Sequence, residues 1–234
     1  MVGAGDIALC GSTDDEATAD LLDGIAGTVV TFGDNAYPDG TTANYNDCYE
    51  PSWGRHKNRT SPSVGNHEYH VSGAADYFNY FGSAAGDPSK GYYSYVLDTW
   101  LIIVLNYNCS AVGGCSAGSP QETWLRSQLA ANMDMNVLAY WHYPLFSSSY
   151  HGNNSSMRPF WQALYDYGAE VVLNGHDHDY ERFARQTPQG VADPVYGIRE
   201  FVVGTGGAGL YDFNQPEPNS EVRNSGTFGV LKLT

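Results

Sequence analysis

The sequence predicts an α/β sandwich, because short apolar runs alternate along the chain with segments of helical pattern. Apolar residues make up 42% of the 234 residues, which is enough for a packed core and excludes wholesale disorder. Domains of α/β type commonly run to roughly 200–250 residues as one unit. We therefore expect a single domain over residues 1–234.

Residues 2–32 have the pattern of a β-α-β unit. The first strand is expected to close at 7–9, and the second to cover 28–32. Between them, Thr13 and Glu16 have the spacing of a capping box, which predicts the start of a helix. The apolar positions of this helix are Leu21, Leu22 and Ile25.

Later elements follow from the same patterns. Apolar runs predict strands at 62–64, 92–97, 100–105, 137–141, 170–173, 201–203 and 228–233. Asp98-Thr99 links two of these runs as a hairpin, and helices are expected from about Pro120 and over 159–167. The chain ends in a strand-like stretch without an evident partner, so a missing C-terminal strand or domain stays open.

Charge excludes two classes of partner. With 11 Lys+Arg against 26 Asp+Glu, the formal net charge is −15, which argues against a nucleic-acid or anionic-membrane binder.

The sequence shows no membrane-spanning segment. Apolar runs such as 100–105 are far shorter than the ~20 residues of a spanning helix. No signal peptide is visible, which leaves a removed leader open.

The four cysteines point to an oxidising compartment, and hence to a secreted or periplasmic protein. Cys109 and Cys115 flank a Gly-rich loop and could close a short bridge, which leaves Cys10 and Cys48 as the other pair. Four reduced thiols or a zinc site are the alternatives, although no C-x-x-C spacing occurs.

Metal-binding residue types follow several of the apolar strands. In open α/β sheets, sites form outside the carboxyl ends of the strands, so residues distant in sequence can meet at one edge. Taken singly, an Asp after a strand is usually a turn residue and a lone His a satisfied core residue. Carboxylates and imidazoles together suit Zn, Fe and Mn, and a pair of ions can clamp a phosphoryl group. The residues concerned are Asp6, Asp34, Asn66, His67, His142, His176 and His178.

These residues lie in five motifs: Gly5-Asp6, Gly33-Asp34-Asn35-Ala36-Tyr37, Gly65-Asn66-His67-Glu68, His142, and Gly175-His176-Asp177-His178. Together the motifs resemble those of the calcineurin-like metallophosphoesterases, and Tyr37 points to their purple acid phosphatase branch. The resemblance implies a four-layer α/β/β/α metallophosphoesterase sandwich. Two departures are slight, with Ala8 and Ala139 standing where the family usually has Gly and Val.

The resemblance also implies two metal ions that share the carboxylate of Asp34. The first, expected to be Fe(III), would be held by Asp6, Asp34, Tyr37 and His178. A hard, highly charged cation suits an anionic phenolate, although outside this motif Tyr37 would be taken for a turn residue. The second, expected to be Fe, Zn or Mn(II), would be held by Asp34, Asn66, His142 and His176.

The implied reaction is hydrolysis of a small phosphate monoester by in-line attack of metal-bound hydroxide. His67, with His151 as a second candidate, would protonate the leaving oxygen. Glu68 and Asp177 could orient ligands, whereas His56 and His70 have no motif support and are taken as bystanders. A phosphodiesterase or nucleotide hydrolase on the same centre is the main alternative, and a non-catalytic metal- or phosphate-binding module is a remote one.

Three other patterns are discounted. Residues 204–209 match G-x-G-x-x-G, but no helix pattern follows, so this loop is expected near the metal-binding edge instead. Residues 114–118 match G-x-S-x-G without a preceding strand. The aromatic cluster at 77–81 is expected to belong to the core.

Overall fold

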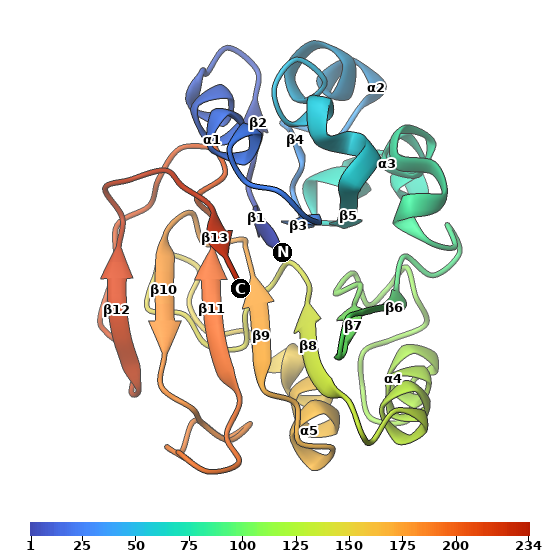
Figure 1. Cartoon of the computed structure of the whole chain (residues 1–234), viewed down its shortest axis with the longest axis vertical. Helices are drawn as coiled ribbons and strands as arrows, with labels where there is room; N and C mark the ends of the chain where they lie inside the picture. Colours follow the sequence, from blue (N-terminus) through green and yellow to red (C-terminus); the bar gives the residue numbers. More distant parts are fainter.

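The computed structural model describes residues 1–234 and confirms the four-layer α/β/β/α arrangement (Figure 1). Two β-sheets lie face to face at the centre, with helices outside each. On the side of the smaller sheet lie α1 (Asp14–Asp23), α2 (Thr42–Asn44) and α3 (Ala75–Phe81). On the side of the larger sheet lie α4 (Pro120–Ala131) and α5 (Arg158–Asp166).

The smaller sheet has the strand order β13-β1-β3-β5. Strand β1 (Val2–Ala4) runs parallel to β3 (Val29–Phe32), which runs parallel to β5 (Thr60–Ser63). Strand β13 (Leu231–Lys232) pairs antiparallel with β1. The last apolar run therefore finds its partner at the start of the chain, although only two of its residues form a strand.

The expected closure of the first strand at 7–9 is wrong. The backbone leaves β1 at Asp6, which has a φ of 58°, and Ala8–Leu9 forms a separate strand, β2. Strand β2 pairs in parallel with β4 (Ala36–Tyr37), which also follows a residue of positive φ, Asp34. The parallel pairing of β1 with β3 thus continues as the pairing of β2 with β4, after a turn at Asp6 in one segment and at Asp34 in the other.

The capping box at the start of α1 is also wrong. Thr13 occupies the N-cap position, but its side chain makes no capping hydrogen bond. The hydroxyl of Ser12 instead accepts a hydrogen bond from the backbone N–H of Asp14 at 3.2 Å. This bond satisfies one of the N–H groups that a helix start leaves unpaired. Ile25 lies just beyond the helix, which ends at Asp23.

The larger sheet has the strand order β12-β10-β11-β9-β8-β7-β6. The predicted hairpin, the central strands and the helices α4 and α5 are confirmed, whereas β10 and β12 were not predicted. The strands are β6 (Tyr93–Leu97), β7 (Trp100–Val104), β8 (Asn136–Tyr140), β9 (Val171–Asn174), β10 (Tyr180–Phe183), β11 (Arg199–Val203) and β12 (Ser220–Asn224).

Short helical turns complete the elements. A π-helical turn covers Tyr45–Tyr49, and 3-10 turns cover Trp53–Arg59, His67–His70, Ser72–Ala74, Gly82–Ala85 and Ser155–Met157. No helix is both long enough and apolar enough to cross a bilayer.

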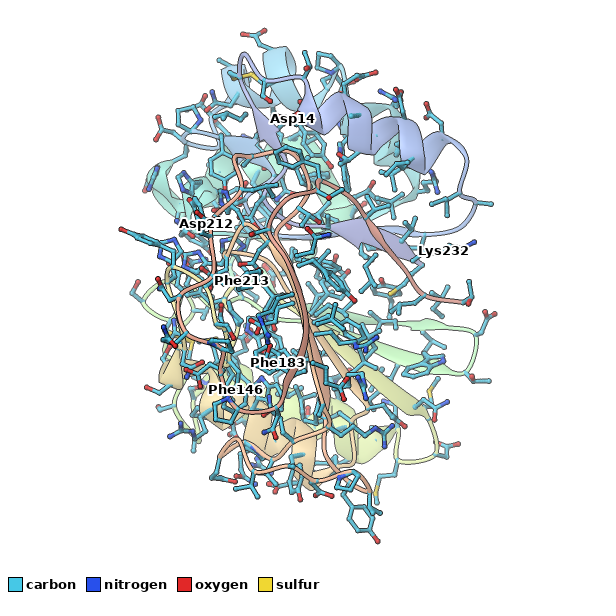
Figure 2. All side chains as sticks on the ribbon, turned by 90° about the vertical axis from the view of Figure 1, so that its left-hand side faces the viewer. Asp14, Phe146, Phe183, Asp212, Phe213 and Lys232 are labelled. Atoms are coloured by element: carbon cyan, nitrogen blue, oxygen red, sulfur yellow. A yellow bond between two sulfur atoms is a disulfide. The ribbon has the colours of Figure 1, made fainter.

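Strand β7 contributes side chains to two hydrophobic cores, one on each face of the larger sheet. Ile102 and Val104 pack between the two sheets, whereas Leu101 and Ile103 pack against the layer of α4 and α5. Successive side chains of a strand point to opposite faces, so a continuous apolar run is what a strand buried on both sides needs. The aromatic cluster of α3 belongs to the first core, as expected. In Figure 2, the labelled Phe146 and Phe183 of the second core lie far from Asp14 in the opposite helical layer.

Both predicted cysteine pairs form disulfides. Cys10–Cys48 ties β2 to the π-helical turn, and Cys109–Cys115 closes the loop after β7. No cysteine is free.

Candidate metal centre

The site begins with two aspartates that follow neighbouring parallel strands. Asp6 comes after β1 and Asp34 after β3, and both have positive φ values, 58° and 49°. Such a conformation is uncommon outside glycine, although Asp tolerates it. Both carboxylates are buried, with exposed fractions of 0% and 1%. The two strand ends therefore turn both acids into one cavity.

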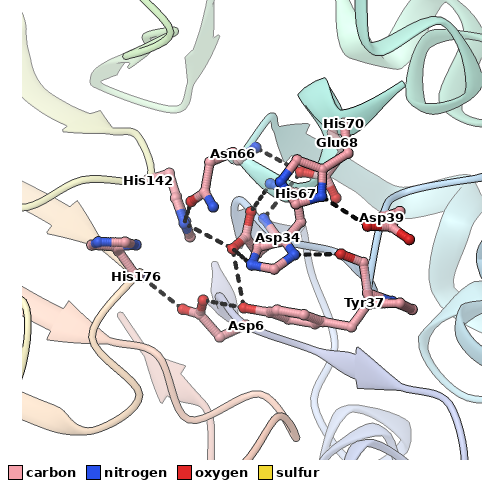
Figure 3. Close-up of polar contacts among 12 residues, drawn as sticks. Asp6, Asp34, Tyr37, Asp39, Asn66, His67, Glu68, His70, His142 and His176 are labelled. Atoms are coloured by element: carbon pink, nitrogen blue, oxygen red, sulfur yellow. Dashed lines mark hydrogen bonds and ion pairs between the residues drawn. The ribbon is translucent and has the colours of Figure 1, made fainter. Parts of the chain in front are cut away.

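Tyr37 joins the two acids (Figure 3). Its hydroxyl oxygen lies 2.8 Å from Oδ1 of Asp6, 3.0 Å from Oδ2 of Asp34 and 3.1 Å from Nε2 of His178. Nε2 of His178 lies 3.3 Å from the same Asp6 oxygen. A phenol carries a single proton, so it can donate to only one of these neighbours at a time.

A second group of donors meets on the other side of Asp34. His142 follows β8, and its Nε2 lies 3.1 Å from Oδ2 of Asp34 and 3.0 Å from the amide oxygen of Asn66. Its Nδ1 lies 2.8 Å from the carbonyl oxygen of Phe32, which fixes the ring orientation. The Asp34 carboxylate is thus shared between the Tyr37 group and the His142 group.

His176 and His178 follow β9 on one tight turn. His176 has a φ of 73°, its backbone N–H donates to Oδ2 of Asp6 at 2.7 Å, and its ring centroid lies 5.1 Å from that of His142. Nδ1 of His178 contacts the carbonyl oxygen of Gly209 at 2.5 Å. The turn sends the first ring toward the His142 group and the second toward the Tyr37 group. All seven predicted ligand residues therefore gather at one edge of the two sheets.

Two motif glycines make room for the acids. A Cβ on Gly65 would lie 2.0 Å from Oδ1 of Asp34, and a Cβ on Gly175 would lie 2.6 Å from Oδ2 of Asp6. Separations under 3.0 Å force atoms to shift. Glycine is therefore required at both positions by the neighbouring ligand side chain.

The acids and imidazoles shift one another's ionisation. Burial alone would raise the pKa of Asp34, but the nearby rings of His142 and His67 hold this pKa well below its usual range. Burial opposes protonation of His142, yet Asp34 and Asp6 raise its pKa to about 9. Burial, with His142 and His151 nearby, lowers the pKa of His176 to about 2, so this ring is a neutral nitrogen donor.

Tyr37 behaves differently without a cation. Burial, reinforced by Asp34 and Asp6, raises its pKa well above the usual range, so the side chain is a neutral phenol. A phenolate forms here only where a cation replaces the proton.

The donor set fits metal ions. Ligand atoms of Asp6, Asp34 and His142 lie within 4.8 Å of one another, and all three residues are buried. Three polar atoms lie within 3.1 Å of the Tyr37 hydroxyl oxygen, which carries a single proton. A cation would satisfy this convergence, and one proton does not. Oxygen and imidazole donors of this kind suit Fe, Zn and Mn.

The two candidate acids lie at opposite sides of the ligand set. Nε2 of His67 is 3.7 Å from Oδ2 of Asp34, and its ring packs on Tyr37 with centroids 4.5 Å apart. His151 is exposed, and its ring lies 4.2 Å from that of His176. His67 thus lies beside the Tyr37 group, and His151 lies beside His176 of the other group of candidate ligands.

Two buried acids hold the ligand loops in place. Glu68 accepts hydrogen bonds from the backbone N–H groups of Asp34, Asn35 and Gly65. Asp177 accepts from the Ser147 hydroxyl and from the backbone N–H of His151. The structure therefore supports an orienting role for both.

Several neighbours of the ligands were not predicted. Tyr143 stacks on His176 with centroids 3.5 Å apart, and Tyr211 stacks on His178 at 4.1 Å. The supposed bystander His70 lies 4.9 Å from the His67 ring and contacts Asp39 at 2.9 Å. The sequence offered one signal for these neighbours, because Tyr143 directly follows the candidate ligand His142. His56, by contrast, pairs with Asp23 of α1, away from the site.

The glycine-rich loop at 204–209 packs against the ligand strand, as expected. The N–H of Gly206 donates to the carbonyl oxygen of Gly5, and that of Ala208 to the carbonyl oxygen of Asp6, both at 2.9 Å. A Cβ on Gly204 would lie 2.8 Å from Oδ2 of Asp6. The glycines thus serve close packing, not a dinucleotide.

A fold with two facing sheets and a buried cluster of acids and imidazoles at their strand ends defines a metallophosphoesterase-type protein. Residues 4–180 match the model of the calcineurin-like phosphoesterase family, and the chain belongs to this family, in its purple acid phosphatase-like branch. The binuclear metal centre of the family is consistent with the buried Asp6, Asp34 and His142.

Relatives and solved structures agree with this placement. Purple acid phosphatase 15 of Arabidopsis thaliana is 27% identical over 87% of this chain and 44% of its own length. Tartrate-resistant acid phosphatase type 5 of Mus musculus is 35% identical over 35% of this chain and 25% of its own. The purple acid phosphatase PPD1 from yellow lupin shares the fold with a TM-score of 0.74 at 17% identity, over 97% of this chain and 47% of that one. The chain thus spans less than half the length of these relatives.

Proposed function

We propose that this chain is a phosphohydrolase that cleaves phosphate monoesters at a centre of two metal ions. The observation that carries the proposal is the position of the Asp34 carboxylate between two donor groups. One group is Asp6, Tyr37 and His178, and the other is Asn66, His142 and His176. A shared carboxylate between two such groups suits a pair of cations that clamp one phosphoryl group.

The two groups differ in chemistry, and this difference supports different cations. The first offers a phenol, which suits Fe(III) once deprotonated, and the second offers an amide oxygen and neutral imidazoles, which suit Fe, Zn or Mn(II). When bound, the ions would supply an activated water and neutralise charge on the phosphoryl oxygens.

The side chains at the rim would handle the leaving group. His67 lies beside Asp34 and Tyr37, with its backbone N–H bonded to Oδ1 of Asp34 at 2.9 Å. This bond ties its position to the bridging carboxylate. We assign His67 as the donor of a proton to the leaving oxygen, and His151, on the other side, as the second candidate.

The disulfides support a place of action outside the reducing cytosol. Cys10–Cys48 and Cys109–Cys115 leave no free thiol, and such bridges persist in oxidising compartments. We therefore propose that the protein is secreted or periplasmic.

The test is hydrolysis of phenyl phosphate and of the diester diphenyl phosphate by protein loaded with iron, zinc or manganese. We expect turnover of the monoester to exceed that of the diester, and Asp34→Ala to abolish both. A faster diester would replace the monoesterase assignment with a phosphodiesterase. Metal-loaded protein that hydrolyses neither, or an Asp34→Ala variant with full turnover, would contradict the proposal.

A further inference from the structure

An exposed tyrosine stands at the rim of the candidate metal centre. Tyr150 is 70% exposed, although its neighbours Ser147, Ser148 and Ser149 are buried. Its ring contacts His151 edge-on at 5.0 Å and lies 5.9 Å from that of Tyr211. Tyr211 in turn stacks on His178 with an interplanar angle of 9°. A row of three neighbouring rings therefore leads from Tyr150 to the candidate ligand His178.

The loop that carries Tyr150 is held in place by hydrogen bonds from Asn214. Asn214 donates its backbone N–H to the carbonyl oxygen of Ser148 at 2.9 Å and its side-chain N–H to that of Ser149 at 3.0 Å. These bonds tie the loop to the segment after Tyr211. Figure 2 shows that this segment, at Asp212 and Phe213, lies between Asp14 in one helical layer and Phe146 and Phe183 in the second core. The exposed ring is therefore presented by a fixed loop, which lowers the entropy cost of binding on it.

No lysine or arginine side chain contacts this ring or the candidate ligands. None of the 11 Lys and Arg residues makes an ion pair or hydrogen bond with the seven candidate ligands, or with Tyr150, His151 or Tyr211. With a net charge of −15, the chain also repels polyanions. The contacts at the rim are therefore made by aromatic faces and imidazoles, and no lysine or arginine takes part in them.

We propose that Tyr150, supported by Tyr211, is the binding face for a planar, uncharged aromatic leaving group of a phosphate monoester. The inference rests on the proposed function and names its substrate class. The phosphate would lie at the ligand set, and the aromatic group would stack on the ring that the loop exposes. Offset-stacked and edge-to-face pairs of rings are favourable beyond the area that they bury.

The test compares benzyl phosphate with cyclohexylmethyl phosphate, which differ in the aromaticity of the ring while both leave as primary alcohols. We expect wild-type protein to have the lower KM for benzyl phosphate. Tyr150→Leu should raise that KM by about 3- to 10-fold and leave kcat and the cyclohexylmethyl KM nearly unchanged. Tyr150→Phe should keep the preference. Tyr196→Leu is the matched control, because Tyr196 is 74% exposed and precedes β11, at the end of the sheet opposite to the candidate ligands.

Binding of benzylphosphonate, measured by calorimetry, gives a readout that does not depend on turnover. Its Kd should rise with Tyr150→Leu by the same factor as the KM. If the benzyl preference survives Tyr150→Leu, or if both substrates lose equally, the inference is overturned while the proposed function stands. If wild-type protein hydrolyses neither of these substrates nor phenyl phosphate, the proposed function fails and the inference with it.

Discussion

The carboxylate of Glu68 holds the backbone of Asp34, with Oε2 accepting its N–H at 3.1 Å. The same carboxylate accepts the N–H groups of Asn35 at 2.7 Å and Gly65 at 2.6 Å. Two ligand loops, one after β3 and one after β5, are thus joined at a single buried side chain. This contact explains how Asp34 keeps its positive φ beside Asn66.

Glu68→Gln should therefore loosen both loops. The amide can still accept hydrogen bonds at one end, but its NH₂ group would face backbone donors at the other. An unsatisfied buried donor costs about 1–3 kcal/mol, so we expect a loss of that size in the free energy of unfolding, measured by urea denaturation. Metal affinity should fall about 10- to 100-fold. Glu16→Gln, at an exposed position on α1, is the control; equal effects of both changes would refute the orienting role.

Tyr37→Phe should remove the phenolate ligand without disturbing the fold. If the first metal is Fe(III) bound by phenolate, the iron-loaded wild type is coloured and the variant loses the tyrosinate-to-iron absorbance. Tyr49→Phe is the matched control, because Tyr49 is also a buried tyrosine and its hydroxyl has no partner. A visible band that persists in Tyr37→Phe at equal iron content would exclude the phenolate assignment.

Glu200 should make stability depend on pH. Burial, helped by Glu181, raises the pKa of Glu200 well above its usual range, although the N–H groups of Phe146 and Leu145 act against it. Because the folded pKa exceeds the unfolded one, the stabilisation is complete at acid pH and is lost as the pH rises through the folded value. Glu200→Gln should flatten this decline by at most about 1.4 kcal/mol per pH unit. Urea denaturation from pH 4 upward measures it, and an unchanged slope would contradict it.

The two disulfides should contribute unequally. Cys10–Cys48 spans 38 residues of sequence and Cys109–Cys115 spans 6. From loop closure alone, we expect the Cys10→Ser/Cys48→Ser pair to cost about 4 kcal/mol of unfolding free energy and the Cys109→Ser/Cys115→Ser pair about 2 kcal/mol. Chemical denaturation of both double variants gives the comparison, and the reverse order would show that unfolded-chain entropy does not decide it.

The sequence patterns predicted the strands that are apolar runs and missed the polar strands β10 and β12. Strands β3, β7 and β8 consist mostly of apolar residues because they are covered on both faces. Strand β12 is a mostly exposed, polar edge strand, and its residues carry no alternation to detect. The two-residue strands β2 and β4 exist only because positive-φ turns at Asp6 and Asp34 realign the chain.

The gathering of the seven candidate ligands was predictable, because the family resemblance implied them and residues at the ends of parallel strands converge. Their aromatic partners were not. Tyr143, which stacks on His176, directly follows His142, and this adjacency was its only local signal. Tyr211 reaches His178 through the folding of a separate loop, and this contact leaves no local signal in the sequence. Nor does the contact between His70 and Asp39, which depends on the turn at His67–His70.

Metal analysis of purified protein tests the central claim most directly, because every step depends on Asp34 being shared by two cations. Elemental analysis of wild type, Asp34→Ala and the exposed control Asp20→Ala should be done after loading and dialysis. We predict two metal ions per chain in wild type and in the control, and a loss of both in Asp34→Ala. An Asp34→Ala variant that keeps two ions per chain, or a wild type that binds none, would contradict it.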